Sequence, residues 1–194
     1  AVKYNAKVLL VDNDKQGNIS KYFNLHSYER DSIAELLTDK SISAGDVLRH
    51  TSYGIDVVPA NMNLLRANKE ILIDCTRPQQ SRLKRALDSV CFNYDYCIID
   101  NPPDINMTVI NALYMTDYVI VPIKIDRFSF DGVDQMLEQI EDMREFNSQI
   151  RFLGCLATMY YKSDVCSQGE EWLAAENKYK LFETHIRRTQ KVDE

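Results

Sequence analysis

The sequence is poor in the features that mark membrane, secreted and metal-cluster proteins. No apolar stretch approaches the roughly 18 residues that a membrane-spanning helix needs, and the first residues lack the basic-then-apolar order of a signal peptide. The five cysteines form no C-x-x-C pair and have no histidine at metal-ligand spacing, which gives little support to a zinc or iron–sulfur site. We expect a cytoplasmic protein with reduced, mostly buried thiols.

A strong positive charge is also missing. The net charge of -6 argues against a globally basic nucleic-acid binder, although a local basic patch on an acidic protein is compatible with it. With 45% hydrophobic and 27% charged residues and no long polar tract, a folded globule is expected. We find no repeat, linker or break in composition, and we therefore predict a single domain over residues 1–194.

What the sequence does contain is a series of short apolar runs with helical patterns between them. Runs of four to six aliphatic residues without polar alternation are typical of strands buried on both faces of a parallel sheet. The runs are KVLLVD (7–12), IDVVPA (55–60), YCIIDN (96–101), YVIVPI (118–123), RFLGCLATM (151–159) and KLFETHI (180–186).

The segments between the runs have the 3.6-residue period of amphipathic helices. In FDGVDQMLEQIEDMREF, the residues Val133, Leu137 and Ile140 fall on one face and acids on the other. Pro78 precedes QQSRLKRALDSV, where it is typical of a helix start. Alternating strands and helices predict an α/β fold, doubly wound, with a mostly parallel sheet and helices on both faces.

Acidic and amide residues follow several of the apolar runs directly. In open parallel sheets the ligand lies beyond the carboxyl ends of the strands, so these positions are the candidate site. The residues are Asp12, Asp14, Gln16 and Asn18 after the first run, Asp100, Asn101, Pro102, Pro103 and Asp104 after the third, and Asp126 after the fourth.

Carboxylates gathered at strand ends repel one another unless a cation neutralises them. Hard oxygen ligands with few histidines suit Mg²⁺, which usually arrives with nucleotide phosphates. The alternative is that these acids only cap helices and turns, which strand–helix junctions also favour. Taken together, the clusters favour a phosphate and Mg²⁺ site.

Two segments carry a resemblance to a known family. The segment VLLVDNDKQGN is similar to the D-x-D-x-Q-x-N element of ParA/Soj-type partition ATPases, and YDYCIIDNPPDINMTVINALYMTDYVIVPIKIDRFSFDG resembles their Walker B strand and the residues after it. GIDVVPANMNLL, GCLATMYYKS and THIRRTQKVDE match further family segments in the same order. The resemblance covers most of the chain and implies a P-loop NTPase-like fold with ATP and Mg²⁺ as cofactors.

The resemblance also implies roles for individual residues. Asp14 would orient the water that attacks the γ-phosphate, and Asp12 would join it in the catalytic site. Asp12 and Asp100 would hold the waters around Mg²⁺. The nucleotide-binding loop after the Walker B strand would consist of Asp100, Asn101, Pro102 and Pro103. These roles agree with phosphoryl transfer, which depends on positioned water and neutralised charge.

The glycine-rich P-loop of the family has no counterpart in these 194 residues, which contain no G-x-x-x-x-G-K-[ST] pattern. The P-loop supplies the backbone cradle and the lysine that hold the phosphates. We therefore expect the chain by itself to be a domain truncated at the N-terminus, and at the C-terminus as well, that neither binds ATP tightly nor hydrolyses it. A Walker B strand (Tyr96 to Asp100) without the neighbouring first strand would either close up against another strand or expose an edge that pairs with a second chain.

The resemblance implies partners as well. Family members bind DNA without sequence specificity as ATP-held homodimers, and the matching basic positions here are Arg187, Arg188 and Lys191. Lys162, Lys178 and Lys180 are possible neighbours, and an ordinary solvated face is the alternative for all six. The family further implies a ParB-like adaptor protein and a nucleoid-associated location. The chain shows no C-terminal amphipathic helix of the kind that anchors the MinD relatives, so no membrane partner is expected.

Two functions from different classes remain open at this point. The first is a ParA-type ATPase of plasmid or chromosome partitioning, in which MgATP hydrolysis controls dimerisation and non-specific DNA binding. The second is a non-catalytic ParA-like module that keeps the fold and binds a ParB-like adaptor without nucleotide.

Overall fold

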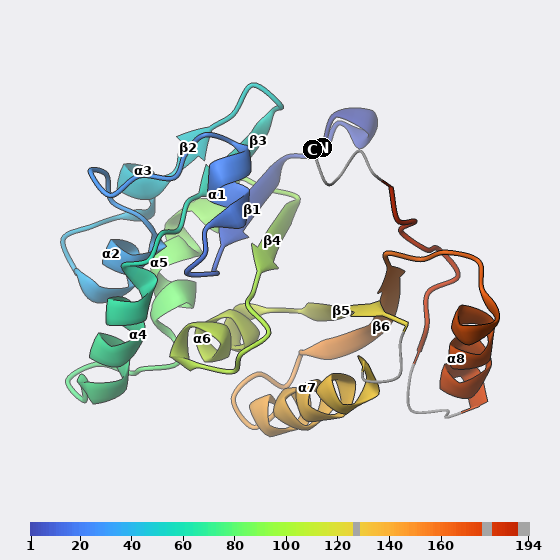
Figure 1. The fold of residues 1–194 in the computed structure, drawn as a ribbon. Helices are drawn as coiled ribbons and strands as arrows, with labels where there is room; N and C mark the ends of the chain where they lie inside the picture. Colours follow the sequence, from blue (N-terminus) through green and yellow to red (C-terminus); the bar gives the residue numbers. More distant parts are fainter. Residues whose placement is uncertain (126–128, 176–179, 190–194) are drawn as a thin grey trace. The chain divides into compact units, whose positions relative to one another are not determined.

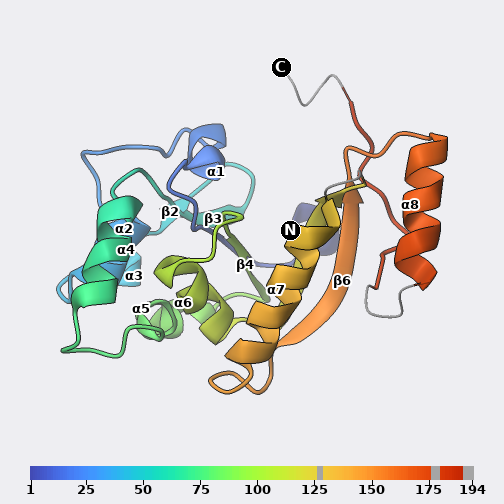
Figure 2. The ribbon, with the colours of Figure 1, turned by 60° about the horizontal axis from the view of Figure 1, so that its bottom comes forward.

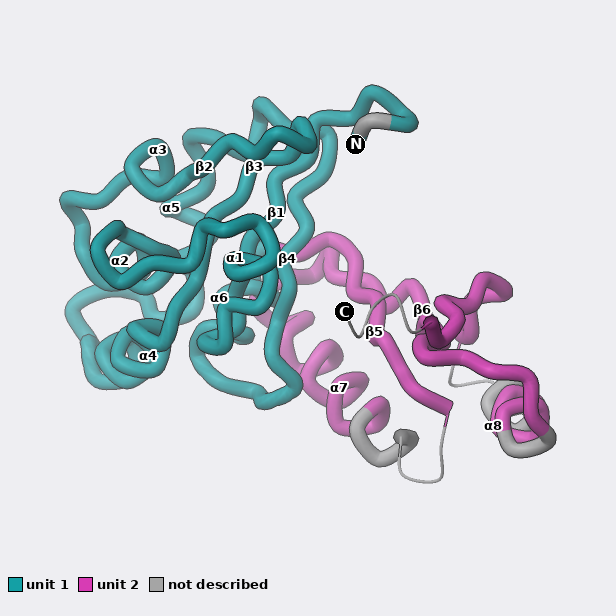
Figure 3. Tube along the Cα trace, turned by 45° about the horizontal axis from the view of Figure 1, so that its top comes forward, with its two compact units in different colours: residues 1–115 teal, residues 116–194 magenta. Residues whose placement is uncertain are grey.

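The computed structural model describes residues 1–125, 129–175 and 180–189. The chain divides into two compact units, residues 1–115 (unit 1) and 116–194 (unit 2), which we describe separately (Figure 3). Unit 1 contains η1 Val2–Tyr4, β1 Val8–Asp12, α1 Asn18–Tyr22, α2 Ile33–Thr38, α3 Ala44–Val47, β2 Arg49–His50, β3 Ile55–Val58, α4 Leu64–Ile73, α5 Arg82–Cys91, β4 Tyr96–Asp100 and α6 Met107–Met115.

Unit 1 is built on a four-stranded sheet in the order β2-β3-β1-β4. β1 lies between β3 and β4 and pairs with both in parallel, whereas the short β2 runs antiparallel to β3 (Figure 1). β1, β3 and β4 are three of the predicted strands, and the helices between them are the crossovers that parallel pairing requires. The predicted α/β class with a mostly parallel sheet is confirmed.

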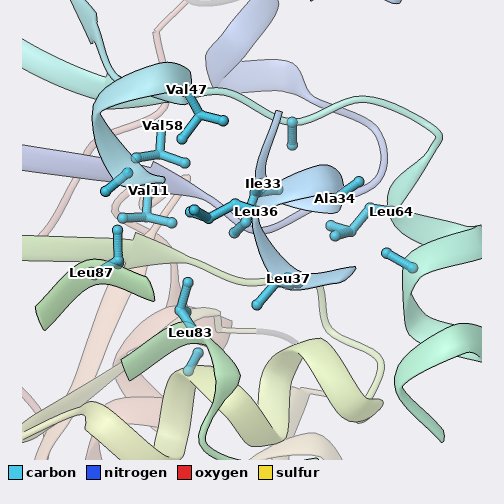
Figure 4. Close-up of a cluster of buried hydrophobic side chains, with 14 of the residues drawn as sticks. Val11, Ile33, Ala34, Leu36, Leu37, Val47, Val58, Leu64, Leu83 and Leu87 are labelled. Atoms are coloured by element: carbon cyan, nitrogen blue, oxygen red, sulfur yellow. The ribbon is translucent and has the colours of Figure 1, made fainter. Parts of the chain in front are cut away.

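The core of unit 1 lies where the sheet meets α2 and α5. Val11 of β1 packs with Leu37 of α2 and Leu87 of α5 (Figure 4). Leu9 of β1 belongs to the same cluster, and all four side chains are buried. The Ser32 side chain accepts a hydrogen bond from the backbone N–H of Ala34, and the Glu35 side chain accepts one from the backbone N–H of Ser32. This capping box fixes the start of α2. Burying side chains of this size contributes roughly 1.5–3 kcal/mol each, so this cluster holds β1 rigidly in place.

β4 forms one edge of the sheet. Among the residues that the structure describes, no strand pairs with its free side. Cys97 and Ile99 pack on the core cluster, whereas Tyr96 and Ile98, which point to the opposite face, are 63% and 53% exposed. Within unit 1, β4 thus pairs with β1 on one side and has no paired strand on the other.

Unit 2 contains a pair of parallel strands with helices around it. Its elements are β5 Tyr118–Lys124, α7 Ser129–Met143, β6 Arg151–Thr158 and α8 Asp164–Ala175. α7 lies against β5 and β6 (Figure 2), and Val133 and Cys155 are buried in the shared apolar cluster. The β5–β6 register shifts between Val119 and Ile120, opposite Gly154, whose φ is 148°.

The segment 180–186 differs from the sequence-based expectation of a strand. It pairs with β6 through one isolated parallel bridge, Cys155 with Leu181, and a second bridge joins Tyr160 with Arg187 just beyond the two segments. The register shift at Gly154 marks a bulge in β6. Cys155 N donates to Lys180 O at 2.6 Å and Phe182 N donates to Cys155 O at 2.9 Å, but these bonds do not extend into a regular ladder. No helix in the described part of the chain is long and apolar enough to cross a membrane.

Candidate functional site

The candidate site lies in unit 1, where β1 and β4 end side by side. The parallel register places Asp12 opposite Asp100 at the last pair of the ladder. One residue further on, Asn13 N donates to Asp100 O at 2.9 Å. Two carboxylates that are distant in the sequence therefore stand at adjacent strand ends, as the apolar runs predicted.

Asp12 is fully buried and is held by α1. Its Oδ2 accepts from the backbone N–H of Ser20 at 2.9 Å and from the Ser20 hydroxyl at 2.6 Å. The other oxygen, Oδ1, accepts from Asp14 N at 3.3 Å. The Ser20 hydroxyl in turn accepts from Ala60 N at 2.8 Å, which connects the ends of β1 and β3. Asp12 therefore anchors the loop after β1 as well as lying in the candidate site.

Asp14 is only partly buried and lies in the turn between Asp12 and α1. Its Oδ1 accepts from Gln16 N at 3.0 Å, and its carbonyl accepts from Gly17 N at 2.9 Å. Gly17 has φ 61°, and a Cβ there would lie 2.7 Å from Ala60 O. The turn thus needs glycine at this position for both its backbone angle and its close approach to the end of β3.

The surroundings of Asp100 make its carboxyl group harder to ionise. The residue is exposed at the sheet edge, but nearby protein atoms still remove water from around its carboxyl group. This partial burial raises the pKa of Asp100, and the negative charges of Asp12 and Asp14 raise it further. A cation placed among the three carboxylates would reverse this effect, so the electrostatics favour a positively charged ligand here.

An asparagine pair joins the loops that follow the two strands. Asn13 is fully buried, and its Nδ2 donates to Asn101 Oδ1 at 2.7 Å and to Thr108 O at 3.0 Å. The sequence-based reasoning missed this residue because it occupies the variable position between Asp12 and Asp14. The available signal was an amide directly after a buried strand, where a loop needs hydrogen-bond partners.

The loop after β4 is fixed at both ends. Pro102 is buried and Pro103 is exposed. Asn106 starts α6, where its Oδ1 accepts from Thr108 N at 2.9 Å. Between them, Asp104 forms an ion pair with Lys15 Nζ at 3.6 Å, which links this loop to the one after β1. The sequence analysis gave Lys15 no role, although it places a positive charge beside the acids.

The side-chain oxygens of the site suit magnesium held through its water shell better than direct ligation. Among the described residues, no three histidine, cysteine, aspartate or glutamate side chains form a group that could hold a metal ion. The oxygens of Asp12 already accept hydrogen bonds, which fits contact with a metal through water better than direct ligation. Asn13 Oδ1 is buried without a hydrogen-bond partner in the described structure. Hard oxygen atoms and a free acceptor fit hydrated Mg²⁺.

The predicted DNA-binding positions belong to unit 2. Arg187 and Arg188 are exposed, and Arg188 N donates to Tyr160 O at 3.0 Å. The ring of His185 stacks on the ring of Tyr160, with the two centroids 4.2 Å apart. The Nε2 atom of His185 lies 2.7 Å from Oε1 of Glu170. Lys162 and Lys180 are exposed as well. Lys191, Lys178 and Asp126 lie outside the described residues.

The chain is similar to known proteins over most of its length. A family model described as "AAA domain" matches residues 1–152. The sporulation initiation inhibitor protein Soj of Bacillus subtilis is 33% identical over 155 residues, which span 79% of this chain and 60% of Soj. The chromosome partitioning protein ParA of Caulobacter vibrioides is 29% identical over 193 residues, 97% of this chain and 72% of ParA.

A solved structure shows the same fold. Cobyrinic acid a,c-diamide synthase from Mycobacterium smegmatis, crystallised with a bound ATP analogue and magnesium, superposes with a TM-score of 0.89. It is 28% identical in sequence, and the match covers 97% of this chain and 78% of that protein.

Parallel strands that deliver carboxylates to one sheet edge, together with this structural likeness, define an α/β protein of the P-loop NTPase class. Within that class, the chain belongs to the ParA/Soj-type partition ATPase family. It spans about 60% of the length of Soj.

Proposed function

We propose that this chain belongs to an ATPase of plasmid or chromosome partitioning in which MgATP binding and hydrolysis control dimerisation and binding to non-specific DNA. The observation that carries the proposal is the pairing of Asp12 with Asp100 at the ends of β1 and β4. Asp14 completes the acidic group, and partial burial followed by the charges of Asp12 and Asp14 raises the pKa of Asp100. Such a group is stabilised by a cation, and a nucleotide supplies it as its magnesium complex.

Each acid has a role that its surroundings support. Asp12 and Asp100 would hold water molecules of the magnesium shell, and the bound metal would neutralise charge on the phosphates. Asp14 would orient the attacking water, which fits its partial exposure in the loop after β1. Asp12 also fixes that loop through Ser20, so it would position Asp14 as well.

The loop that follows β4 would respond to the nucleotide. Asn101 accepts a hydrogen bond from Asn13 at 2.7 Å, and Asp104 forms an ion pair with Lys15 at 3.6 Å. Because these contacts join the loop after β4 to the loop after β1, a ligand that moves one loop would also act on the other. Pro102 and Pro103 restrict the backbone between these two contacts. Asn101 to Pro103 would form the switch that reports the state of the nucleotide.

The proposed partners are a second copy of the chain, DNA and a ParB-like adaptor, in a cytoplasmic, nucleoid-associated protein. The exposed Arg187 and Arg188, with Lys191, would contact DNA phosphates. Contacts of this kind give an affinity that falls steeply with salt, with a log–log slope of about -0.9 per phosphate neutralised. A flat salt response would remove DNA from the list of partners.

The test is a titration of fluorescent ATP, with and without Mg²⁺, into this chain and into a version extended by a family-type first strand and P-loop. We expect the extended version to bind in a Mg²⁺-dependent manner. Asp100→Asn in that version should weaken the magnesium dependence, whereas Asp117→Asn, which alters an exposed aspartate of unit 2, should leave it unchanged.

The possible outcomes separate the two functions. If only the extended version binds, the acids belong to a working nucleotide site. If neither binds, the acids serve as caps and anchors, and the adaptor-binding module takes the place of the ATPase. If Asp100→Asn and Asp117→Asn bind alike, the assignment of Asp100 to the magnesium shell is wrong.

A further inference from the structure

The segment that carries the two exposed arginines of unit 2 is fixed to the end of β6. Tyr160 N donates to Ile186 O at 3.0 Å, and Arg188 N donates to Tyr160 O at 3.0 Å. Arg187 lies between these two bonds and forms the bridge with Tyr160. Ile186 N also donates to Ala157 O at 2.8 Å. The backbone of residues 186–188 is therefore held by hydrogen bonds on both sides of Arg187.

The side chains next to this segment form a cluster of three. The ring of His185 stacks on the ring of Tyr160, with the centroids 4.2 Å apart and the planes at 12°. Glu170 of α8 contacts both rings with its carboxylate. Its Oε1 lies 2.7 Å from Nε2 of His185, and its Oε2 accepts a long hydrogen bond of 3.4 Å from the Tyr160 hydroxyl. The cluster thus joins α8 to the residue before the basic segment.

The carboxylate of Glu170 lacks a well-directed hydrogen bond on one of its oxygens. In the described structure, Oε1 is buried and has no hydrogen-bond partner of good geometry, although Nε2 of His185 is close. A buried anionic oxygen without such a bond is unfavourable. A positive charge at this separation stabilises it whatever the direction of the N–H bond. Protonated His185 would supply that charge.

The other groups of the cluster leave this role to the histidine. The loss of water around its hydroxyl raises the pKa of Tyr160, and the charge of Glu170 raises it further, whereas Arg187 lowers it. Cys166 of α8 is buried and also acts on Tyr160. Among the described residues of this cluster, histidine is the residue type that changes charge near neutral pH. The charged residues of the same segment, all exposed, are Lys180, Glu183, Arg187 and Arg188.

We propose that protonation of His185 neutralises Glu170 and so strengthens the binding of DNA phosphates by the segment 185–188. This inference rests on the proposed DNA-binding role of Arg187 and Arg188. With a neutral His185, Glu170 is an uncompensated negative charge beside the arginines and repels phosphates. With a protonated His185, the charges of the pair cancel and the arginines attract phosphates without that opposition.

Two substitutions should have opposite effects. Glu170→Gln removes the negative charge and keeps the size of the side chain, so DNA should bind at about pH 8 as tightly as it binds the wild-type protein at about pH 6. His185→Gln keeps an amide donor that never becomes charged, so binding should stay weak at both pH values. If the pair served only to hold the segment in place, both substitutions would weaken binding.

The experiment measures the binding of a fluorescent DNA duplex of arbitrary sequence at constant ionic strength. The proteins are the 194-residue chain and the version extended by a first strand and P-loop, the latter with MgATP. From about pH 8 to about pH 6 the affinity of the wild-type protein should rise about two- to fivefold, as expected for one charge pair near the surface. His50→Gln is the matched control, because His50 pairs with Asp56 in unit 1 and its loss should leave the pH response unchanged.

The outcomes separate this inference from the proposal on which it rests. If the wild-type protein does not bind DNA at either pH, or if Arg188→Ala binds as tightly as wild type, the DNA-binding proposal is wrong and this inference is wrong with it. If Arg188→Ala weakens binding but His185→Gln keeps the wild-type pH response, only the inference is wrong. Circular dichroism checks the fold of each variant. Should His185→Gln not fold, Glu170→Gln decides the question by itself, since a loss of structure cannot produce tighter binding at the higher pH.

Discussion

Ser20 holds Asp12 with two hydrogen bonds to a single carboxylate oxygen, one from its hydroxyl at 2.6 Å and one from its backbone N–H at 2.9 Å. The hydroxyl also accepts from Ala60 N at 2.8 Å. Ser20 is fully buried, as is Asp12. The carboxylate proposed for the magnesium shell is therefore part of the framework that joins β1, α1 and the end of β3.

Ser20→Ala should destabilise the fold. The substitution leaves Asp12 and Ala60 N short of a buried partner, and an unsatisfied buried polar group costs about 1–3 kcal/mol. Urea denaturation measures the change in the free energy of unfolding. Ser27→Ala is the matched control, since its hydroxyl accepts only from Glu29 N in an exposed position and should matter by about 0.5 kcal/mol or less. Equal effects of the two substitutions would mean that the Ser20 contacts carry no net stability.

Gly17→Ala should be more harmful than Gly54→Ala. Both glycines have positive φ, 61° and 66°, so each substitution includes a similar backbone cost of about 1 kcal/mol. A Cβ at Gly54 would have nothing within 4 Å, whereas one at Gly17 would lie 2.7 Å from Ala60 O. The difference between the two unfolding free energies isolates this clash. If the two variants are equally stable, the loop after β1 can move away from β3 at no cost.

Asp100→Asn should stabilise the chain near neutral pH. The folded state raises the pKa of Asp100 above its ordinary value of 3.8, so it binds this proton more tightly than the unfolded state does. The free energy of unfolding therefore decreases as the pH rises from the ordinary aspartate pKa through the raised pKa of Asp100, because Asp100 becomes ionised over this range. The advantage of the asparagine should disappear in acid. Unfolding curves recorded between pH 3 and pH 8 measure it.

A substitution with the opposite sign serves as the control for Asp100. Hydrogen bonds from the side chain and backbone of Ser43 lower the pKa of Asp46 in the folded state. The ionised Asp46 therefore stabilises the fold at any pH above the ordinary aspartate pKa, and this stabilisation is lost as the pH falls through the lowered pKa of Asp46. Asp46→Asn should therefore destabilise the chain at neutral pH. Curves of the same sign for both variants would contradict the assigned environments.

The ion pair between Lys15 and Asp104 should be weak. The two side chains are 31% and 71% exposed at a separation of 3.6 Å, and pairs of this kind typically contribute about 1 kcal/mol or less. A double-mutant cycle with Lys15→Gln and Asp104→Asn measures the coupling, which should shrink in high salt. A larger, salt-independent coupling would show that the two loops are locked together rather than free to separate.

The strands of the site could be predicted from the sequence because each is a continuous apolar run with polar residues at its end. VLLVD and YCIID became β1 and β4, and the parallel pairing brought Asp12 and Asp100 together. The expected burial on both faces holds for β1, whereas Tyr96 and Ile98 of β4 are exposed because no described strand or helix of unit 1 covers that face. The apolar runs were nevertheless sufficient to locate both strands.

The contacts that complete the site could not be predicted in this way. Asn13, Ser20 and Lys15 act through partners far along the chain, at Asn101, Ala60 and Asp104. No local periodicity contains that information. The segment 180–186 was wrongly predicted as a strand: its apolar residues lie beside β6, but the backbone bonds between them are too few to form a ladder.

Gly154 is a position that should tolerate no substitution although it takes no part in any chemistry. Its φ of 148° and the carbonyl oxygen of Lys180, with which any Cβ would collide, leave room for glycine only. In a mutational library selected for folded protein, this site should be nearly invariant although it carries no reactive group. Invariance at such a position would record the bend of a strand, and a survey that ranked residues by invariance alone would mistake it for catalysis.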